Sequence, residues 1–176
     1  MKETFRQQLT DAWGRKHIDR IVEQVAENPS CFADLYALTK DEDETTAWRA
    51  AWACEKLSIC CPGLFAAPED LRGELMLRAQ TCKHGGIRRL LLNMLLHLPV
   101  FVPIDVPFLN FCLGNMSSPS ETPAGQAASI KLAYALCCKE PELLEELRLC
   151  LENMEPEYYT AAVQCARSNV LKKIRK

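Results

Sequence analysis

Residues 45–65 read TTAWRAAWACEKLSICCPGLF, and no proline or glycine occurs in this stretch before Pro62. Apolar residues lie on most sides of a helical wheel drawn through it, so a helix formed here has to be covered on several sides. Stacked helical hairpins provide that cover, because each hairpin lies between two neighbours. We therefore predict that this segment is an inner helix of a layered, all-helical protein.

A weak internal repeat supports the layered arrangement. Segments of similar pattern begin at Ala47, Gly86 and Gly125, and they read AWRAAWACEKLSICCPGLF, GIRRLLLNMLLHLPVFVPI and GQAASIKLAYALCCKEPEL. Arg49 and Arg88 occupy equivalent positions in the first two segments, and Gln126 lies near the third equivalent position. The spacing between segments nearly matches the period of HEAT and armadillo repeats, roughly 40–47 residues.

Prolines mark the starts of several predicted helices, because the first helical turn tolerates a missing N–H. Six prolines stand at such positions: Pro29, Pro68, Pro107, Pro123, Pro141 and Pro156. We predict helices over residues 2–12, 16–27, 30–39, 44–60, 68–81, 85–98, 106–116, 123–138, 141–154 and 157–174. No segment shows sustained alternation of apolar and polar residues, so we predict no β-sheet.

The phrase WRAAWACEKLS, followed by CPGLF, resembles the second helix of a HEAT-type repeat. AENPSCFADLYALT and KEPELLEELRLCLE fit the same family pattern. The whole chain resembles short bacterial HEAT-like repeat proteins of unassigned function, and it is distantly similar in shape to the alkylpurine DNA glycosylases. The resemblance implies an all-α fold, a right-handed α-solenoid of antiparallel HEAT-like helical hairpins, forming a single domain over residues 1–176. These motifs are structural, so they identify a scaffold and not an activity.

The composition is that of an ordinary soluble protein, with 48% hydrophobic and 25% charged residues. A formal net charge of -2 gives no general attraction to nucleic acid or to anionic lipid. The first residues, MKETFRQQLTDAW, are polar and contain no signal-peptide stretch. The most apolar run, IRRLLLNMLLHLPVFVP, is too short and too interrupted to span a bilayer. We therefore expect a cytoplasmic protein without membrane association.

The ten cysteines do not indicate a disulfide framework. Two pairs are adjacent in sequence, Cys60 with Cys61 and Cys137 with Cys138, and adjacent cysteines are poor disulfide partners. Most of the others fall inside apolar helical patterns. We therefore expect reduced thiols that act as small apolar side chains.

Trp48 and Trp52 form the first candidate binding surface. They share one stripe of the predicted helix with Glu55, and Arg49 lies alongside. The stripe either packs under a neighbouring hairpin or offers a stacking and cation–π surface to a ligand group. We expect Trp52 to lie nearer to solvent and Trp48 to be more buried.

Arg49, Arg88 and Lys131 decide between two classes of partner. The arginines could bind phosphates, but the family resemblance implies that they hydrogen-bond along the stack, and a single charge per repeat favours this structural role. A groove lined by all three cations would favour nucleic acid, and a neutral groove around the tryptophans would favour a protein.

We identify no catalytic, cofactor-binding or metal-ligating residues and expect no cofactor. Cys82 and His84 lie close in sequence, but no second pair occurs at ligand spacing. Our first hypothesis is a non-catalytic helical-repeat scaffold that binds a protein or peptide partner in its concave groove. The alternative is a nucleic-acid-binding protein related to the alkylation-repair DNA glycosylases, although Glu55 is the nearest substitute for the carboxylate which those enzymes use. The candidate binding residues are Trp48, Arg49, Trp52, Glu55, Arg88 and Lys131.

Overall fold

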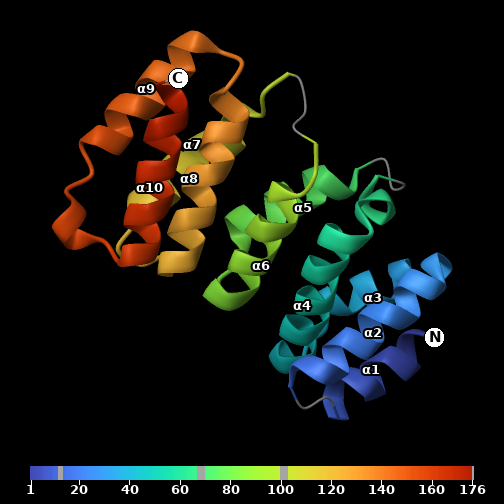
Figure 1. Cartoon of the computed structure of the whole chain (residues 1–176). Helices are drawn as coiled ribbons and strands as arrows, with labels where there is room; N and C mark the ends of the chain where they lie inside the picture. The colour runs from blue at the N-terminus through green and yellow to red at the C-terminus, as the bar shows by residue number, and fades with distance from the viewer. Residues whose placement is uncertain (12–13, 67–69, 100–102, 176) are drawn as a thin grey trace. The chain divides into compact units, whose positions relative to one another are not determined.

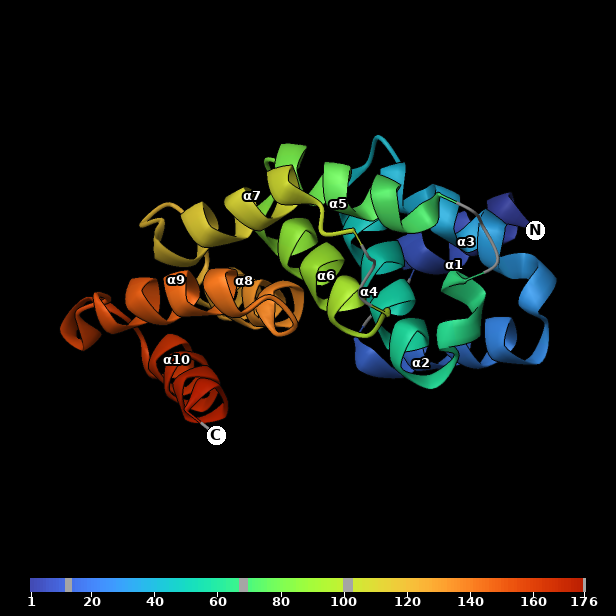
Figure 2. The same ribbon diagram turned by 90° about the horizontal axis from the view of Figure 1, so that it is seen from above.

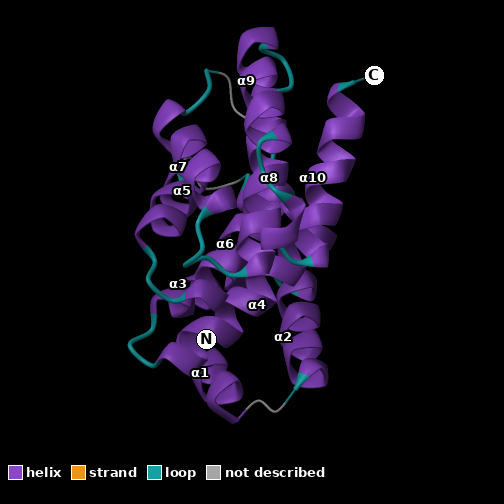
Figure 3. Cartoon of the chain, turned by 90° about the vertical axis from the view of Figure 1, so that its left-hand side faces the viewer, coloured by secondary structure: helices purple, strands orange, loops and turns teal. Residues whose placement is uncertain are grey.

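The computed structural model describes residues 1–11, 14–66, 70–99 and 103–175. Its regular structure is helical, and the described residues contain no strand (Figure 3). The predicted all-α fold is confirmed. The chain divides into two compact units, Met1–Glu74 and Leu75–Lys176, which we call unit 1 and unit 2.

Unit 1 is built around one long helix. Its helices are α1 (Lys2–Asp11), α2 (Arg15–Glu27), α3 (Phe32–Ala37) and α4 (Glu44–Cys60), and it also contains the first turn of α5 (Leu71–Thr81). Helix α4 packs against α1, α2 and α3 (Figure 1). Short 3-10 turns at Pro29–Cys31 and Leu38–Lys40 flank α3, and a third turn, Pro62–Phe65, follows α4.

Small side chains allow the close packing of α4. Ala50, Ala53, Cys54 and Leu57 are all 0% exposed, so these residues form the packed face of this helix. Asp43 begins the helix, because its carboxylate accepts a hydrogen bond from the backbone N–H of Thr46 at 2.8 Å. The helix found from sequence at residues 44–60 therefore has the predicted bounds.

Unit 2 is arranged around α8. Its complete helices are α6 (Gly85–Leu96), α7 (Val106–Ser117), α8 (Pro123–Cys137), α9 (Pro141–Glu152) and α10 (Ala161–Ile174). Helix α8 packs against α6, α7 and α10, and it lies between α6 and α10 in two perpendicular views (Figures 1 and 2). All residues over 125–130 are buried. These are small or apolar except for Gln126 and Ser129, which find polar partners within the unit.

The expectation that prolines mark helix starts is correct for α8 and α9, which begin at Pro123 and Pro141. It is wrong at Pro156, where only a 3-10 turn, Pro156–Tyr158, forms and α10 begins at Ala161. Pro29 likewise begins a 3-10 turn, so the predicted helix over 30–39 is in fact α3 between two such turns. The expected start at Pro68 lies outside the described residues.

The ten cysteines are free thiols, and several lie deep in the helical layers. Burial raises the pKa of Cys112 to about 12 and that of Cys137 to about 11, so both stay protonated at neutral pH. Over the described ranges, no helix combines the length and the apolar character that crossing a membrane requires. The right-handed sense of the predicted superhelix and its assignment to a single domain stay predictions.

Candidate functional site

The two tryptophans of α4 form a pair on a surface of unit 1. The Trp48 and Trp52 ring centroids lie 5.4 Å apart, and the ring planes are tilted by 39°. Both residues are partly exposed. The pair therefore offers apolar area to solvent, and the expected difference in burial between the two rings stays a prediction.

Polar contacts border the tryptophan pair. Lys56, one turn beyond Trp52, places its Nζ 2.8 Å from the Asp19 carboxylate and so joins α4 to α2. Glu55 is partly exposed, and its backbone carbonyl accepts a hydrogen bond from the Ser58 hydroxyl. An apolar centre with a charged border is the general pattern of protein-binding surfaces.

Arg49 is held inside unit 1 by the end of α1. Its Nη1 donates to the backbone carbonyl of Leu9 at 2.6 Å and to that of Thr10 at 3.0 Å. The last carbonyls of a helix lack partners within the helix and carry partial negative charge, so a guanidinium stabilises them. The structural role expected for Arg49 is confirmed.

The equivalent residues of unit 2 make the same kind of contact. Arg88 donates through Nε and Nη2 to the carbonyl of Cys82, at 2.9 and 2.6 Å, just after the end of α5. Gln126 donates through Nε2 to the carbonyl of Ser118, at 2.8 Å, just after the end of α7. The neutral amide at the third position thus takes the place of the arginine.

A fourth residue that binds the end of a neighbouring helix was not identified in the sequence analysis. Arg167 of α10 donates to the carbonyls of Leu151 and Glu152, at 2.5 and 3.3 Å, in the last turn of α9. The signal was available, because Arg167 follows Gln126 by about one HEAT-type period. We call Arg49, Arg88, Gln126 and Arg167 the clamp residues.

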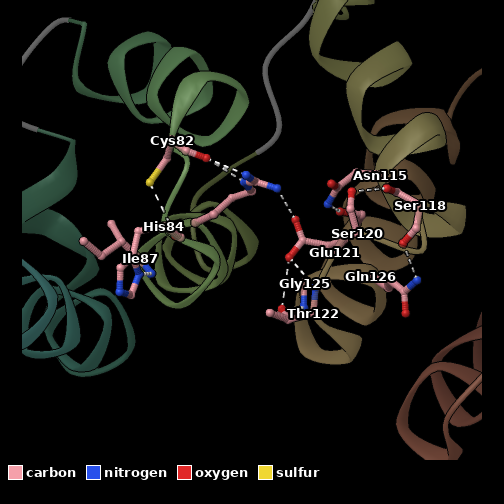
Figure 4. Close-up of polar contacts among 12 residues, drawn as sticks. Cys82, His84, Ile87, Asn115, Ser118, Ser120, Glu121, Thr122, Gly125 and Gln126 are labelled. Carbon is pink, nitrogen blue, oxygen red and sulfur yellow. Dashed lines mark hydrogen bonds and ion pairs between the residues drawn. The ribbon is translucent and has the colours of Figure 1, made fainter.

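Arg88 also binds a buried carboxylate which the sequence analysis did not identify. Its Nη1 lies 2.5 Å from Oε2 of Glu121, whose side chain is only 1% exposed. Oε1 of Glu121 accepts hydrogen bonds from the backbone N–H and the hydroxyl of Thr122, at 2.7 and 3.0 Å. Figure 4 shows the Cys82 carbonyl and the Glu121 carboxylate joined to one guanidinium group. Each partner of this ion pair is therefore satisfied on more than one side.

A buried side-chain pair completes the polar core beside this network. The Asn115 amide donates to the Ser129 hydroxyl at 2.8 Å and joins α7 to α8. Thr122 caps α8, because its hydroxyl accepts from the backbone N–H of Gly125 at 3.1 Å. These contacts fix the position of α8 within unit 2.

The three cations that were to decide the partner class differ in their roles. Arg49 and Arg88 bind backbone carbonyls, so their guanidinium groups are already occupied. Lys131 of α8 is exposed and makes no ion pair with any described residue. No group of three or more His, Cys, Asp or Glu side chains in the described part of the chain could hold a metal ion.

A family model for the HEAT repeat domain matches residues 5–174. The chain belongs to the HEAT repeat family. The match extends across both units, and the resemblance to HEAT-type repeats found in the sequence is confirmed. No curated protein and no solved structure matches the chain. Membership of the HEAT family identifies a helical-repeat scaffold, within which the clamp residues hold the ends of neighbouring helices.

Proposed function

We propose that this HEAT repeat protein is a non-catalytic scaffold that binds a protein or peptide partner. The second helices of the hairpins, which line the concave groove of a HEAT stack, supply the binding face. The observation that carries the proposal is the partly exposed tryptophan pair of α4, with ring centroids 5.4 Å apart.

The chemistry of the pair suits a protein partner. Each indole offers a wide apolar surface and one N–H donor, and it loses little conformational entropy on binding. Tryptophan is accordingly enriched among the residues that contribute most to protein interfaces. Trp52 is the residue we assign to the centre of the contact, since Lys56 and Arg49 border its polar side.

The hydrogen bonds of the arginines favour a protein over a nucleic acid. Binding to a phosphate backbone requires several free cations, and its strength grows with their number. Arg49 and Arg88 are committed to carbonyl groups, and Arg88 also pairs with Glu121. Of the three cations named from the sequence, only Lys131 is left for a phosphate.

Trp52→Ala tests the proposal, with Ile59→Ala as a matched control. Ile59 lies on the same helix and is 58% exposed, so both variants remove a surface apolar group from α4. Proteins captured from the native host by the wild-type chain are compared with those captured by each variant. The captured partner is then purified, and its dissociation constant is measured for all three chains.

We expect Trp52→Ala to weaken binding by about tenfold or more, as truncation of an interface hot spot does, and Ile59→Ala to leave it unchanged. Thermal melts of Trp48→Ala and Trp52→Ala separate binding from packing. If Trp52→Ala lowers the melting temperature as much as Trp48→Ala and leaves partner affinity unchanged, the pair is a packing feature and the proposed site is wrong.

A further inference from the structure

The second helices of unit 2 form a layer without carboxylates. α6, α8 and α10 lie side by side, with α8 between the other two (Figures 1 and 2). Their sequences contain no aspartate or glutamate, but they contain six cations. These are Arg88, Arg89, Lys131, Arg167, Lys172 and Lys173. The acidic side chains of the unit's helices lie instead on α9, which carries four glutamates.

One of these cations lies over an aromatic ring of the neighbouring helix. Nζ of Lys173, on α10, lies over the ring of Tyr134 on α8, 5.4 Å from its centroid. Lys131 precedes Tyr134 by three residues, so it lies on the same side of α8. Two exposed ammonium groups and a partly exposed ring therefore form one patch across two packed helices. We call Lys131, Tyr134 and Lys173 the basic patch.

No carboxylate of the described residues neutralises the charges of the patch. Neither lysine forms an ion pair with any residue that the structure describes. The nearby C-terminal arginine, Arg175, is instead paired with Glu152 at 3.1 Å, and Arg148 binds Glu145 and the same Glu152. Clamp residues Arg88 and Arg167 hold backbone carbonyls. The two lysines of the basic patch, like Arg89 and Lys172 of the same layer, are thus left for an external anion.

We propose that the basic patch binds an acidic segment of the protein partner, with glutamate or aspartate carboxylates between Lys131 and Lys173 and an aliphatic stem against Tyr134. This inference rests on the proposed function, because it names the chemistry of the partner. The carboxylate-free layer is complementary in charge to such a segment, and that complementarity speeds and orients association.

The distribution of charge favours an acidic peptide over nucleic acid. Unit 2 carries 12 lysines and arginines and 9 aspartates and glutamates, whereas unit 1 carries 9 and 14. The net charges are therefore +3 and -5. Binding to a nucleic-acid backbone grows with the number of free cations, and the basic patch supplies only two, whereas a short acidic segment can be held by the patch alone.

The test measures fluorescence anisotropy of a labelled peptide of alternating glutamate and serine, titrated with the full chain at low ionic strength. The variant is the double substitution Lys131→Glu and Lys173→Glu. Its matched control is Lys16→Glu with Lys83→Glu, two exposed lysines elsewhere that change the net charge equally. The same peptide with glutamine in place of glutamate, and a single-stranded oligothymidine, serve as the other two probes. Circular dichroism melts establish that each variant is folded.

We expect the wild-type chain and the control to bind the glutamate peptide, and the patch variant to bind it roughly tenfold more weakly, since two favourable charge contacts become repulsive. Equal binding by the two double variants, or no preference for glutamate over glutamine, overturns the proposal. Tighter binding of the oligothymidine assigns the patch to nucleic acid and overturns it as well. The proposed function is tested separately by Trp52→Ala in unit 1, so a failure of the acidic-partner proposal leaves that result standing.

Discussion

Gly125, in the first turn of α8, leaves little room for an added side chain. A Cβ atom built there lies 2.5 Å from Oε1 and 2.7 Å from Cδ of Glu121. The absence of a side chain allows the buried carboxylate to lie against the first turn of α8 while it binds Arg88. Gly125 carries a hydrogen atom where alanine would carry a methyl group. This leaves room for the ion pair between Arg88 and Glu121, which are 33 residues apart in sequence.

Gly125→Ala is expected to displace Glu121 and to lower the free energy of unfolding by about 1–3 kcal/mol, as other substitutions that overfill a packed site do. Gly114→Ala is the matched control, because Gly114 also lies in a helix and nothing lies within 4 Å of its added Cβ. There the substitution should stabilise the protein by about 0.5–1 kcal/mol, since alanine favours helix over glycine. Urea denaturation of both variants gives the two values, and equal stabilities would contradict the packing described here.

The sequence allowed the role of the arginines to be predicted but not that of Glu121, and the reason is physical. Arg49 and Arg88 recur at the repeat period, and a charge that recurs on an apolar helix indicates a structural partner. Glu121 lies in a polar connector and has no periodic equivalent, so nothing local distinguishes it from a solvated carboxylate. Its burial results from tertiary packing, which composition and spacing do not encode. Exposure of Trp48 and Trp52 depends on packing in the same way, and the helical stripe alone left two interpretations open.

At the scale of a helix, the clamp residues act on helix ends. Arg167 supplies two donors and a positive charge to the last turn of α9, where the Leu151 carbonyl also accepts a hydrogen bond from the backbone N–H of Met154 at 3.3 Å. Arg167→Met keeps much of the aliphatic stem and removes the hydrogen-bond donors and the positive charge. We expect the free energy of unfolding to fall by about 1–2 kcal/mol, a value typical for hydrogen bonds to a charged group at a partly exposed site.

Lys172→Met controls for the loss of a positive charge from α10. Lys172 is exposed and holds no helix end, so this change should stay within about 0.5 kcal/mol of the wild type. Amide hydrogen exchange gives the finer readout. Arg167→Met should speed exchange in α9 selectively, and uniform changes across unit 2 would show that the clamp has no local action.

The start of α8 was predicted well because a cap and a proline coincide there. Thr122 and Pro123 together define the start of α8, because both the side-chain acceptor and the fixed φ angle suit a first turn. Pro156 misled the prediction, since the 3-10 turn that it starts closes after Tyr158 and the chain is extended at Tyr159. A proline signals a turn, and the residues after it decide whether that turn continues as a helix.

At the scale of the whole chain, acid should destabilise the protein. Hydrogen bonds and charge from Arg6 lower the pKa of Asp41, and Arg175 with Arg148 lowers that of Glu152. A carboxyl whose pKa is lower in the folded state than in the unfolded state stabilises the fold above its unfolded pKa. That contribution is lost as the pH falls through the folded pKa.

The melting temperature should therefore stay level near neutral pH and fall below about 4.5, the ordinary pKa of a glutamate. Glu152→Gln removes one of these carboxylates. Its melting temperature should lie below that of the wild type at pH 7 and approach it in acid. Parallel curves for the two proteins over the whole range would refute this assignment. Because these ion pairs are partly exposed, added salt should narrow the difference in melting temperature between the two proteins.

The clamps of unit 2 have a consequence for how such a chain can change in length. Arg88, Gln126 and Arg167 each bind the end of the helix directly before their own, so both partners of each contact belong to one hairpin. A gene duplication that copies one hairpin also copies the hydrogen bond between its two helices, and a deletion removes both partners of that bond together. Lineages can therefore gain or lose hairpins without first evolving new contacts to set the angle between two helices.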